Sequence, residues 1–262
     1  MPEGDSIHSV ARRLDARLTG DTLTRLGGSD PSLRHHAARL RGAAVERVEA
    51  IGKHLIVEFE GGWALRVHLG MSGRWRFGPP TGVRGDGPAR VALETKSWAA
   101  RCYGPPTVQV DRTPRVWDAV DHLGPDLTAD SPDIDEALDR AYGGDDTRTI
   151  SEVLLDQRIA SGIGNVYRNE VLFEAGVHPE APLSNVEEEQ LAWMYDCASK
   201  HLQVNVGRHR TTTGGRKTGT ESYVYDRAGR PCRRCGETIA QGRSTDLERV
   251  TYWCPGCQEE AR

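Results

Sequence analysis

Four cysteines near the end of the sequence constrain the fold more than any other feature. They form two Cys-x2-Cys pairs separated by eighteen residues: Cys232, Cys235, Cys254 and Cys257. This spacing is typical of two facing knuckles that place four thiolates around one tetrahedral zinc ion. Because protein ligands would fill every position around the metal, the zinc is expected to be structural rather than catalytic.

The alternative for the same cysteines is a pair of disulfide bonds. No secretory signal opens the sequence, and 262 residues can form a hydrophobic core without covalent staples, so a reducing compartment is expected. The zinc interpretation is therefore preferred. The other two cysteines, Cys102 and Cys197, stand alone and are interpreted as core or surface thiols.

The first residues carry the second informative pattern. Met1 precedes the small residue Pro2, and such a methionine is normally removed during synthesis, which would leave Pro2 as a secondary amine. A secondary amine can attack an electrophilic carbon, such as the anomeric carbon of a sugar, and form an iminium ion. Glu3 adds a carboxylate within reach of the same carbon. The alternative is that Met-Pro is a common start and that the acidic residue only favours a helix dipole.

Charge is distributed unevenly along the chain. The net charge is −4, yet residues 121–146 hold nine acidic residues and one basic residue, whereas residues 200–250 hold eleven Lys or Arg and five Asp or Glu. The basic C-terminal part is typical of a phosphate-binding face. No run approaches the roughly 20 apolar residues that a membrane span needs, so no membrane partner is expected.

Hydrophobic periodicity predicts two kinds of domain. Apolar residues at helical spacing predict a helix from Ile7 to Leu18 that anchors the N-terminus. Short alternating runs between Ala44 and Gly104 predict hairpins of an antiparallel sandwich. After Thr149 the pattern is helical, and Ser184 to Glu187 predicts a capping box before a long helix.

Residues 161–165, Ser-Gly-Ile-Gly-Asn, break one predicted helix and begin the next. A glycine turn at a helix N-terminus can bind a phosphate, although an ordinary helix hairpin explains the same pattern. We predict an α+β fold: an N-terminal β-sandwich flanked by helices (1–121), an acidic linker (122–148), a helical domain (149–225) and a zinc ribbon (226–262).

These residues resemble the formamidopyrimidine-DNA glycosylase and endonuclease VIII family, whose C-terminal domain is a helix–two-turn–helix, with the endonuclease VIII-like branch favoured. The resemblance covers nearly the whole chain. It is carried, in order, by Pro2-Glu3-Gly4, Gly52-Lys53, residues 68–73 (His-Leu-Gly-Met-Ser-Gly), Leu123-Gly124-Pro125, residues 162–165 and the cysteine finger. It implies one structural zinc ion and a bifunctional DNA glycosylase and abasic-site lyase of base excision repair.

The resemblance also implies roles for single residues. Pro2 is similar to the nucleophile that displaces a damaged base from C1′ and forms a Schiff base, which leads to β,δ-elimination. Glu3 is similar to the acid/base partner that protonates the sugar ring oxygen, and Lys53 to a lysine that contacts the lesion phosphate. For Lys53 the residues alone leave a solvated hairpin lysine open.

DNA contacts are implied for six further residues. His68, Asn165 and Arg249 resemble a phosphate clamp, although a buried or capping role for His68 stays open. Met71 resembles a residue that fills the hole left by the extruded base, and Arg101 and Tyr103 resemble an Arg-x-Phe-Gly intercalation loop. Ordinary core packing is the alternative for Met71.

The sequence features that bear on the preferred lesion point to two different branches of the family. The short segment 206–223 favours oxidised pyrimidines, whereas Met71 and the Arg101–Tyr103 pair resemble the branch that excises 8-oxoguanine and formamidopyrimidines. A bulky adduct or crosslink substrate, a catalytically silent damaged-DNA-binding protein and a zinc-ribbon interaction protein also stay open. The expected partner is double-stranded DNA with a damaged base or abasic site, bound by a monomer without an obligatory protein partner in the bacterial cytoplasm.

Overall fold

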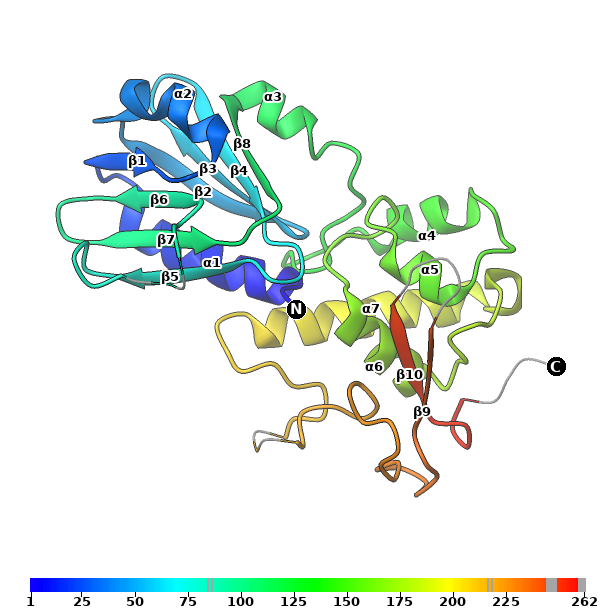
Figure 1. The fold of residues 1–262 in the computed structure, drawn as a ribbon. Helices are drawn as coiled ribbons and strands as arrows, with labels where there is room; N and C mark the ends of the chain where they lie inside the picture. Colours follow the sequence, from blue (N-terminus) through cyan, green and yellow to red (C-terminus); the bar gives the residue numbers. More distant parts are fainter. Residues whose placement is uncertain (84, 86, 216, 218, 244–248, 259–262) are drawn as a thin grey trace. The chain divides into compact units, whose positions relative to one another are not determined.

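The computed structural model describes residues 1–262 except 84, 86, 216, 218, 244–248 and 259–262. The chain divides into two compact units, Met1–His122 and Leu123–Arg262 (Figure 1). Each unit buries its own set of apolar side chains, so each is described by itself.

The first unit contains two four-stranded antiparallel sheets, with strand orders β2-β3-β4-β8 and β1-β6-β7-β5. The strands are β1 (Arg25–Gly27), β2 (Val45–Ile51), β3 (His54–Phe59), β4 (Trp63–His68), β5 (Arg74–Gly78), β6 (Val91–Glu94), β7 (Ala99–Tyr103) and β8 (Thr107–Arg112). The helices are α1 (Gly4–Leu18), α2 (Pro31–Leu40) and α3 (Thr113–Asp118).

One hydrophobic core joins the two sheets. Val57 and Leu65 contribute from the first sheet, Leu93 and Ala100 from the second, and all four are buried. Helix α1 packs against β2 and β3, and α2 packs against β1 and β8. The predicted β-sandwich flanked by helices is therefore confirmed.

The second unit is helical. Its helices are α4 (Ile134–Tyr142), α5 (Ile150–Leu155), α6 (Asn165–Ala175), the 3-10 turn η1 (Leu183–Asn185) and α7 (Glu188–Asn205). The predicted apolar face of α7 is buried: Leu191, Met194, Tyr195, Ala198 and Leu202. These side chains pack with α5 and α6 into one core.

The expected linker over residues 122–148 is not a linker in this structure. It contains α4, whose Ala137, Leu138 and Ala141 are buried in the core of the second unit. Apolar residues recur at helical spacing on one face of this segment while its acidic residues occupy the other face. The acidic residues that suggested a linker therefore belong in part to the exposed face of an amphipathic helix, α4.

The capping box predicted at Ser184–Glu187 does not form, since Glu187 is the N-cap of α7 without a side-chain bond. The structure has its capping box at Thr149 and Glu152, which begins α5. Ser184 lies within η1 (residues 183–185), three residues before the N-cap of α7, so it cannot cap that helix.

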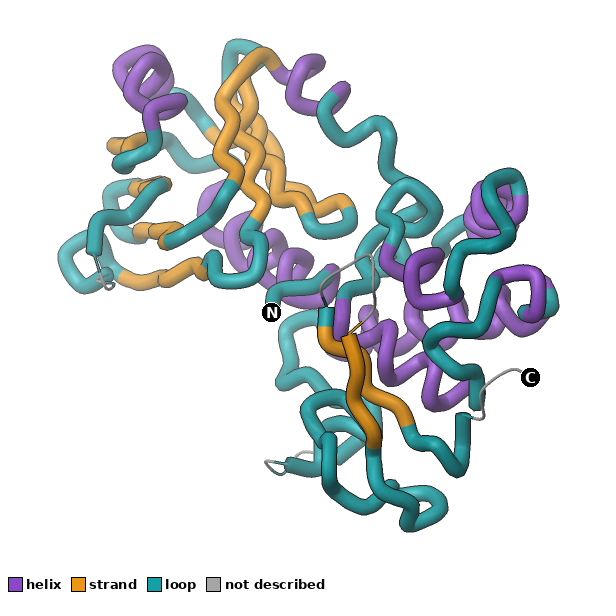
Figure 2. The backbone as a smooth tube through the Cα atoms, turned by 45° about the vertical axis from the view of Figure 1, so that its right-hand side comes forward, coloured by secondary structure: helices purple, strands orange, loops and turns teal. Residues whose placement is uncertain are grey.

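A short ribbon ends the described part of the second unit. Strands β9 (Ala240–Arg243) and β10 (Val250–Trp253) pair antiparallel, and most of the chain around them is loop (Figure 2). The small cluster beneath the ribbon combines Phe173 of α6 with Val224 and Ile239. Among the described residues, no helix is long and apolar enough to cross a membrane.

Candidate active site and DNA interface

The N-terminus is held at the head of α1. The backbone oxygen of Glu3 accepts hydrogen bonds from the amides of Ser6 (3.0 Å) and Ile7 (3.2 Å), so Glu3 is the N-cap residue. The side chain of Glu3 is fully buried, whereas Pro2 is half-buried. Because α1 buries one face in the sandwich core, it fixes the position of the residues at its start.

Lys53 lies in the tight turn between β2 and β3. Gly52 takes the first turn position with φ of +53°, a left-handed value that glycine adopts without strain, and Lys53 follows it. Because the hairpin register pairs Ile51 with His54, Gly52 and Lys53 form the tip of the hairpin between two residues that are held in the sheet.

Two histidines lie beside this tip. His54 of β3 and His68 of β4 are register partners with ring centroids 4.8 Å apart, and His54 Nδ1 lies 3.3 Å from the Arg66 guanidinium. Burial, together with His68 and Arg66, lowers the pKa of His54 to about 3. Burial, Lys53 and Arg66 also lower the pKa of His68, so both rings are neutral near pH 7. The His68 ring can therefore donate an N–H hydrogen bond without carrying a positive charge.

Met71 stands at the tip of the turn between β4 and β5. Its side chain is 77% exposed, more than any other large apolar side chain among the described residues. The amide of Gly73 donates to the oxygen of Leu69 (2.8 Å), which closes the turn. Gly73 has no room for a side chain, because a Cβ there would lie 2.3 Å from that same oxygen. Ordinary core packing is thus wrong for Met71.

Arg101 and Tyr103 lie in strand β7 rather than in a loop. The Arg101 guanidinium donates to Glu94 Oε1 (2.7 Å), to the oxygen of Pro80 (2.9 Å) and to that of Val83. The Tyr103 side chain is buried. Residues 99–103 pair with both β5 and β6, and this pairing explains why Arg101 and Tyr103 lie in a strand. A role for either side chain in DNA would require it to leave these contacts.

In the second unit, Asn165 begins α6 directly after the glycine turn, in which Gly162 has φ of +109°. Its side-chain amide donates to the oxygen of Val250 in β10 (2.9 Å). The next two polar residues on the same helix face continue this contact: Arg168 donates to Thr251 Oγ1 (2.8 Å), and Asn169 accepts from the amide of Tyr252 (2.7 Å).

We call Asn165, Arg168 and Asn169 the polar ladder of α6. All three are buried, and they hold the ribbon strand against the helix. Sequence reasoning missed Arg168 and Asn169. The available signal was their spacing, since residues at positions i, i+3 and i+4 of a helix share one face.

Arg249 directly precedes β10, one residue before the strand that the polar ladder holds, and is half-buried. Asn165 and Arg249 thus belong to the same corner of the second unit, joined through Val250.

A buried carboxylate secures the loop before the ribbon. Glu170 accepts from Thr212 Oγ1 and from the amides of Tyr223 (2.7 Å), Val224 (2.9 Å) and Tyr225 (2.7 Å). No pattern in the sequence indicated this role for Glu170.

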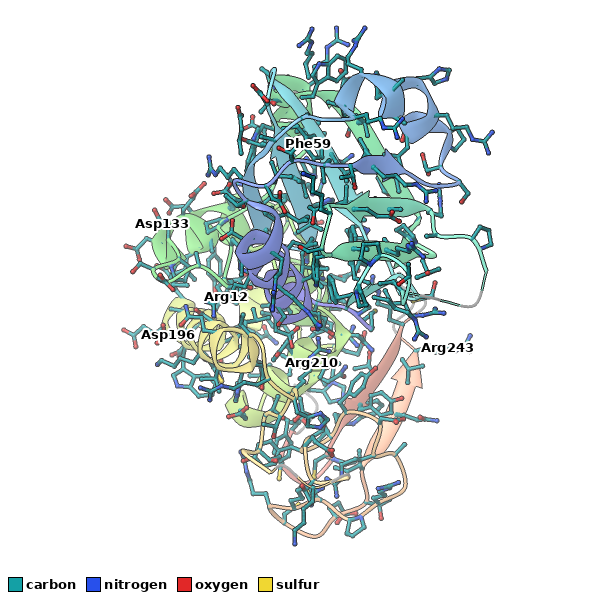
Figure 3. All side chains as sticks on the ribbon, turned by 90° about the vertical axis from the view of Figure 1, so that its left-hand side faces the viewer. Arg12, Phe59, Asp133, Asp196, Arg210 and Arg243 are labelled. Atoms are coloured by element: carbon teal, nitrogen blue, oxygen red, sulfur yellow. The ribbon has the colours of Figure 1, made fainter. Side chains whose placement is uncertain are left out.

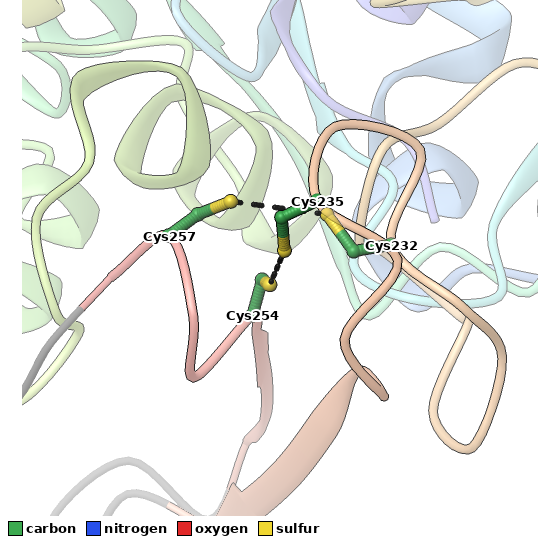
Figure 4. A group of neighbouring side chains, drawn as sticks. All are labelled: Cys232, Cys235, Cys254 and Cys257. Carbon is green, nitrogen blue, oxygen red and sulfur yellow. Dashed lines mark hydrogen bonds between the residues drawn. The ribbon is translucent and has the colours of Figure 1, made fainter.

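The four ribbon cysteines converge as predicted (Figure 4). Their sulfur atoms all lie within 4.8 Å of one another, with Cys235–Cys254 at 3.4 Å and Cys232–Cys257 at 3.9 Å. Sulfurs around a tetrahedral zinc with bonds of about 2.3 Å lie about 3.8 Å apart. Burial raises the pKa of Cys232, but hydrogen bonds from the backbone amides of Cys235 and Arg234, together with those from the side chains of Cys254 and Cys235, lower it to about 7. The cluster fits one zinc ion.

Two family models match the chain. The formamidopyrimidine-DNA glycosylase N-terminal domain matches residues 1–106, and the formamidopyrimidine-DNA glycosylase H2TH domain matches residues 123–216. The probable endonuclease 8 2 of Streptomyces coelicolor is 41% identical over 98% of this chain and 94% of its own length. The DNA-(apurinic or apyrimidinic site) lyase Nei2 of Mycolicibacterium smegmatis is 40% identical over 98% and 99%.

A solved structure shares the fold. The Lactococcus lactis Fpg in complex with DNA containing an abasic site superposes with a TM-score of 0.84 at 25% identity, covering 99% of this chain and 100% of that one. The sandwich with its anchored terminus and the helical unit with its ribbon therefore define the class of the base-excision glycosylases. The chain belongs to the formamidopyrimidine-DNA glycosylase and endonuclease 8 family, on its endonuclease 8-like side.

Proposed function

We propose that this chain is a bifunctional DNA glycosylase and abasic-site lyase of base excision repair, with Pro2 as its nucleophile. The observation that carries this proposal is the terminus: Pro2 adjoins a fully buried Glu3 at the fixed head of α1. A family relationship over 98% of the chain supports it.

The chemistry follows from a secondary amine and a carboxyl group. With Met1 removed, the Pro2 nitrogen attacks C1′ of the damaged nucleotide and the bond from C1′ to the base breaks; the base leaves with the electron pair of that bond and takes up the proton that the amine loses. Protonation of the ring oxygen, assigned to Glu3, opens the sugar and leaves an iminium ion on C1′. Loss of a C2′ proton then expels the 3′ phosphate, and a second elimination expels the 5′ phosphate.

The remaining roles divide between the two units. In the first unit, Lys53 and the neutral His68 contact a backbone phosphate, and exposed Met71 enters the stack where the damaged base has left. In the second unit, Asn165 and Arg249 bind phosphate beside the ribbon, whose zinc keeps the hairpin ordered. Arg101 and Tyr103 take part only if DNA binding draws them from their contacts in β7.

Oxidised pyrimidines are the substrate class that we propose. The support is the short segment 206–223, which Glu170 draws onto α6 through Thr212 and the amides of residues 223–225. A short segment fastened in this way offers less chain to cover a large purine. Excision from duplexes with thymine glycol, compared with 8-oxoguanine, tests this choice; faster excision of 8-oxoguanine would reverse it.

Borohydride trapping on a duplex with one abasic site tests the nucleophile. We expect a covalent adduct with the chain whose Met1 has been removed and none with an N-terminally extended chain, because the extension turns the Pro2 amine into an amide. An adduct with the extended chain would assign the reaction to another amine. No adduct despite binding to the abasic duplex would leave a catalytically silent damaged-DNA-binding protein.

A further inference from the structure

A second group of metal-ligating side chains lies outside the ribbon. Glu174 of α6 and Cys197 and His201 of α7 each offer one ligand atom, and these atoms all lie within 4.8 Å of one another. Glu174 Oε1 and His201 Nε2 are 2.7 Å apart. We call these three residues the α6–α7 cluster.

Helix geometry explains why the cluster forms. Cys197 and His201 are four residues apart, so they share one face of α7. Glu174 is the penultimate residue of α6, which packs against α7. The side chains of Glu174 and His201 are 22% and 20% exposed, so an ion from solvent can reach them.

A comparison within the same unit separates this cluster from an ordinary ion pair. His209 and Glu221 also form a histidine–carboxylate pair, at 3.2 Å, but the His209 side chain is 69% exposed. Among the described residues, only the ribbon and the α6–α7 cluster bring three or more His, Cys, Asp or Glu ligand atoms together. The Cys197 thiol distinguishes the cluster, because it adds a third ligand atom beside the Glu174 carboxylate, and the described surroundings of the His209–Glu221 pair bring no such third atom.

We propose that Glu174, Cys197 and His201 bind one divalent transition-metal ion of the zinc class, independently of the ribbon. Zinc accepts sulfur, imidazole nitrogen and carboxylate oxygen together, and three protein ligands leave a fourth position for water. A thiolate and a carboxylate balance the two positive charges of the ion. Asp196 does not compete for it, because it extends from α7 and pairs with Lys200 at 2.8 Å (Figure 3).

Binding needs two proton changes and no electron transfer. The Cys197 thiol releases its proton to solvent as the sulfur–metal bond forms. His201 presents Nε2 to the metal, so its proton stays on Nδ1 and its hydrogen bond with Glu174 is replaced by two bonds to the ion.

The ion would connect the end of α6 to α7. The same α6 carries the polar ladder that holds β10, and Gly176, just after α6, faces the backbone oxygen of Cys257, which lies 3.4 Å from where a Cβ would be. The metal would therefore brace the helix on which the ribbon is mounted.

Metal counting and cobalt absorption on the full-length, zinc-loaded chain test the proposal. We expect two zinc ions per chain at saturation, and one each for Cys197→Ser and His201→Gln. Co²⁺ added to the chain that already holds ribbon zinc should produce a near-ultraviolet thiolate-to-cobalt band, which Cys197→Ser abolishes. His209→Gln is the matched control and should keep both the second ion and the band.

The ribbon zinc serves as an internal measure of folding, since a variant that still holds one zinc has kept its second unit. One zinc per wild-type chain at saturation would overturn the proposal. So would a second zinc that survives both Cys197→Ser and His201→Gln. If the proline chemistry fails while both zinc ions are present, only the proposed function is lost.

Discussion

Individual side chains behave differently here from what their residue types suggest. His54 and His68 lie beside a basic hairpin tip, yet burial keeps both rings neutral near pH 7. Glu170 is fully buried, but four donors surround it, so it anchors Thr212 and residues 223–225 to α6. In each case the chemistry of the residue is set by its desolvation and by the neighbours that the fold supplies.

The depressed pKa of His54 predicts an acid-sensitive first unit. The ring is neutral in the folded chain down to about pH 3, whereas in the unfolded chain it gains a proton near pH 6.5. Its stabilising contribution is therefore complete above pH 6.5 and falls as the pH drops from 6.5 towards 3. Between pH 6.5 and 5 the loss should be about 2 kcal/mol in the free energy of unfolding.

Urea unfolding across this pH range measures the effect, with His54→Gln as the comparison. The variant should lose part of the pH dependence, and the remainder belongs to His68 and other groups. Identical slopes for the variant and the wild-type chain would show that His54 does not titrate between its folded and unfolded states.

Two short turns carry the predicted DNA-contacting residues Lys53 and Met71 of the first unit. The β2–β3 turn carries Lys53 and the β4–β5 turn carries Met71. Each turn contains a glycine that no other residue could replace without strain or a clash. Gly52 supplies a left-handed φ, whereas Gly73 supplies the space in which the Leu69 oxygen lies. In the second unit the polar ladder of α6 holds β10 in place through side-chain hydrogen bonds.

Gly73→Ala should disrupt the β4–β5 turn. The added methyl would lie 2.3 Å from the backbone oxygen of Leu69, which cannot move without breaking the turn. We expect a loss of about 2–4 kcal/mol in the free energy of unfolding and weaker binding to abasic DNA, because Met71 would be displaced. Denaturant unfolding and a binding titration measure the two effects.

Ser72→Ala is the matched control, since it adds nothing to the same turn at an exposed position. It should leave the free energy of unfolding within about 0.5 kcal/mol of the wild-type value. If Gly73→Ala were equally mild, the tight closure of the turn would not matter for stability.

The molecule as a whole has two hydrophobic cores that are stabilised by different kinds of contact. The sandwich relies on apolar side chains from both sheets and α1, and the second unit combines its helical core with the small cluster under the cysteine ribbon. A ribbon that is mostly loop buries little apolar surface, so we expect a metal held by its four cysteines to supply stability that packing does not.

Zinc removal should therefore act on one unit. Calorimetry of the full chain is expected to show two transitions, of which a strong zinc chelator lowers the one that belongs to the second unit by about 10 °C. The chelator should have a smaller effect on Cys232→Ser, which has already lost a ribbon ligand and keeps only the metal proposed for the α6–α7 cluster. An equal shift of both transitions would show that the two units unfold as one.

Local patterns in the sequence determined a large part of this protein. Two cysteine pairs, helical spacing from Ile7 to Leu18 and strand alternation between Ala44 and Gly104 act over a few residues, so their outcome can be read without a fold. The ordering of the motifs along the chain predicted the family that the comparisons confirm. Met71 is exposed in its turn, and its role in DNA stays a prediction.

Only the tertiary structure decided which distant groups meet. Strand pairing brings Arg101 to Glu94, and the register of β3 and β4 brings His54 to His68. Helix packing joins Glu174 to a cysteine and a histidine more than twenty positions away, and it mounts β10 on α6. These contacts depend on which faces of separate elements are buried against each other, and that is a property of the packed chain that no short window of sequence contains.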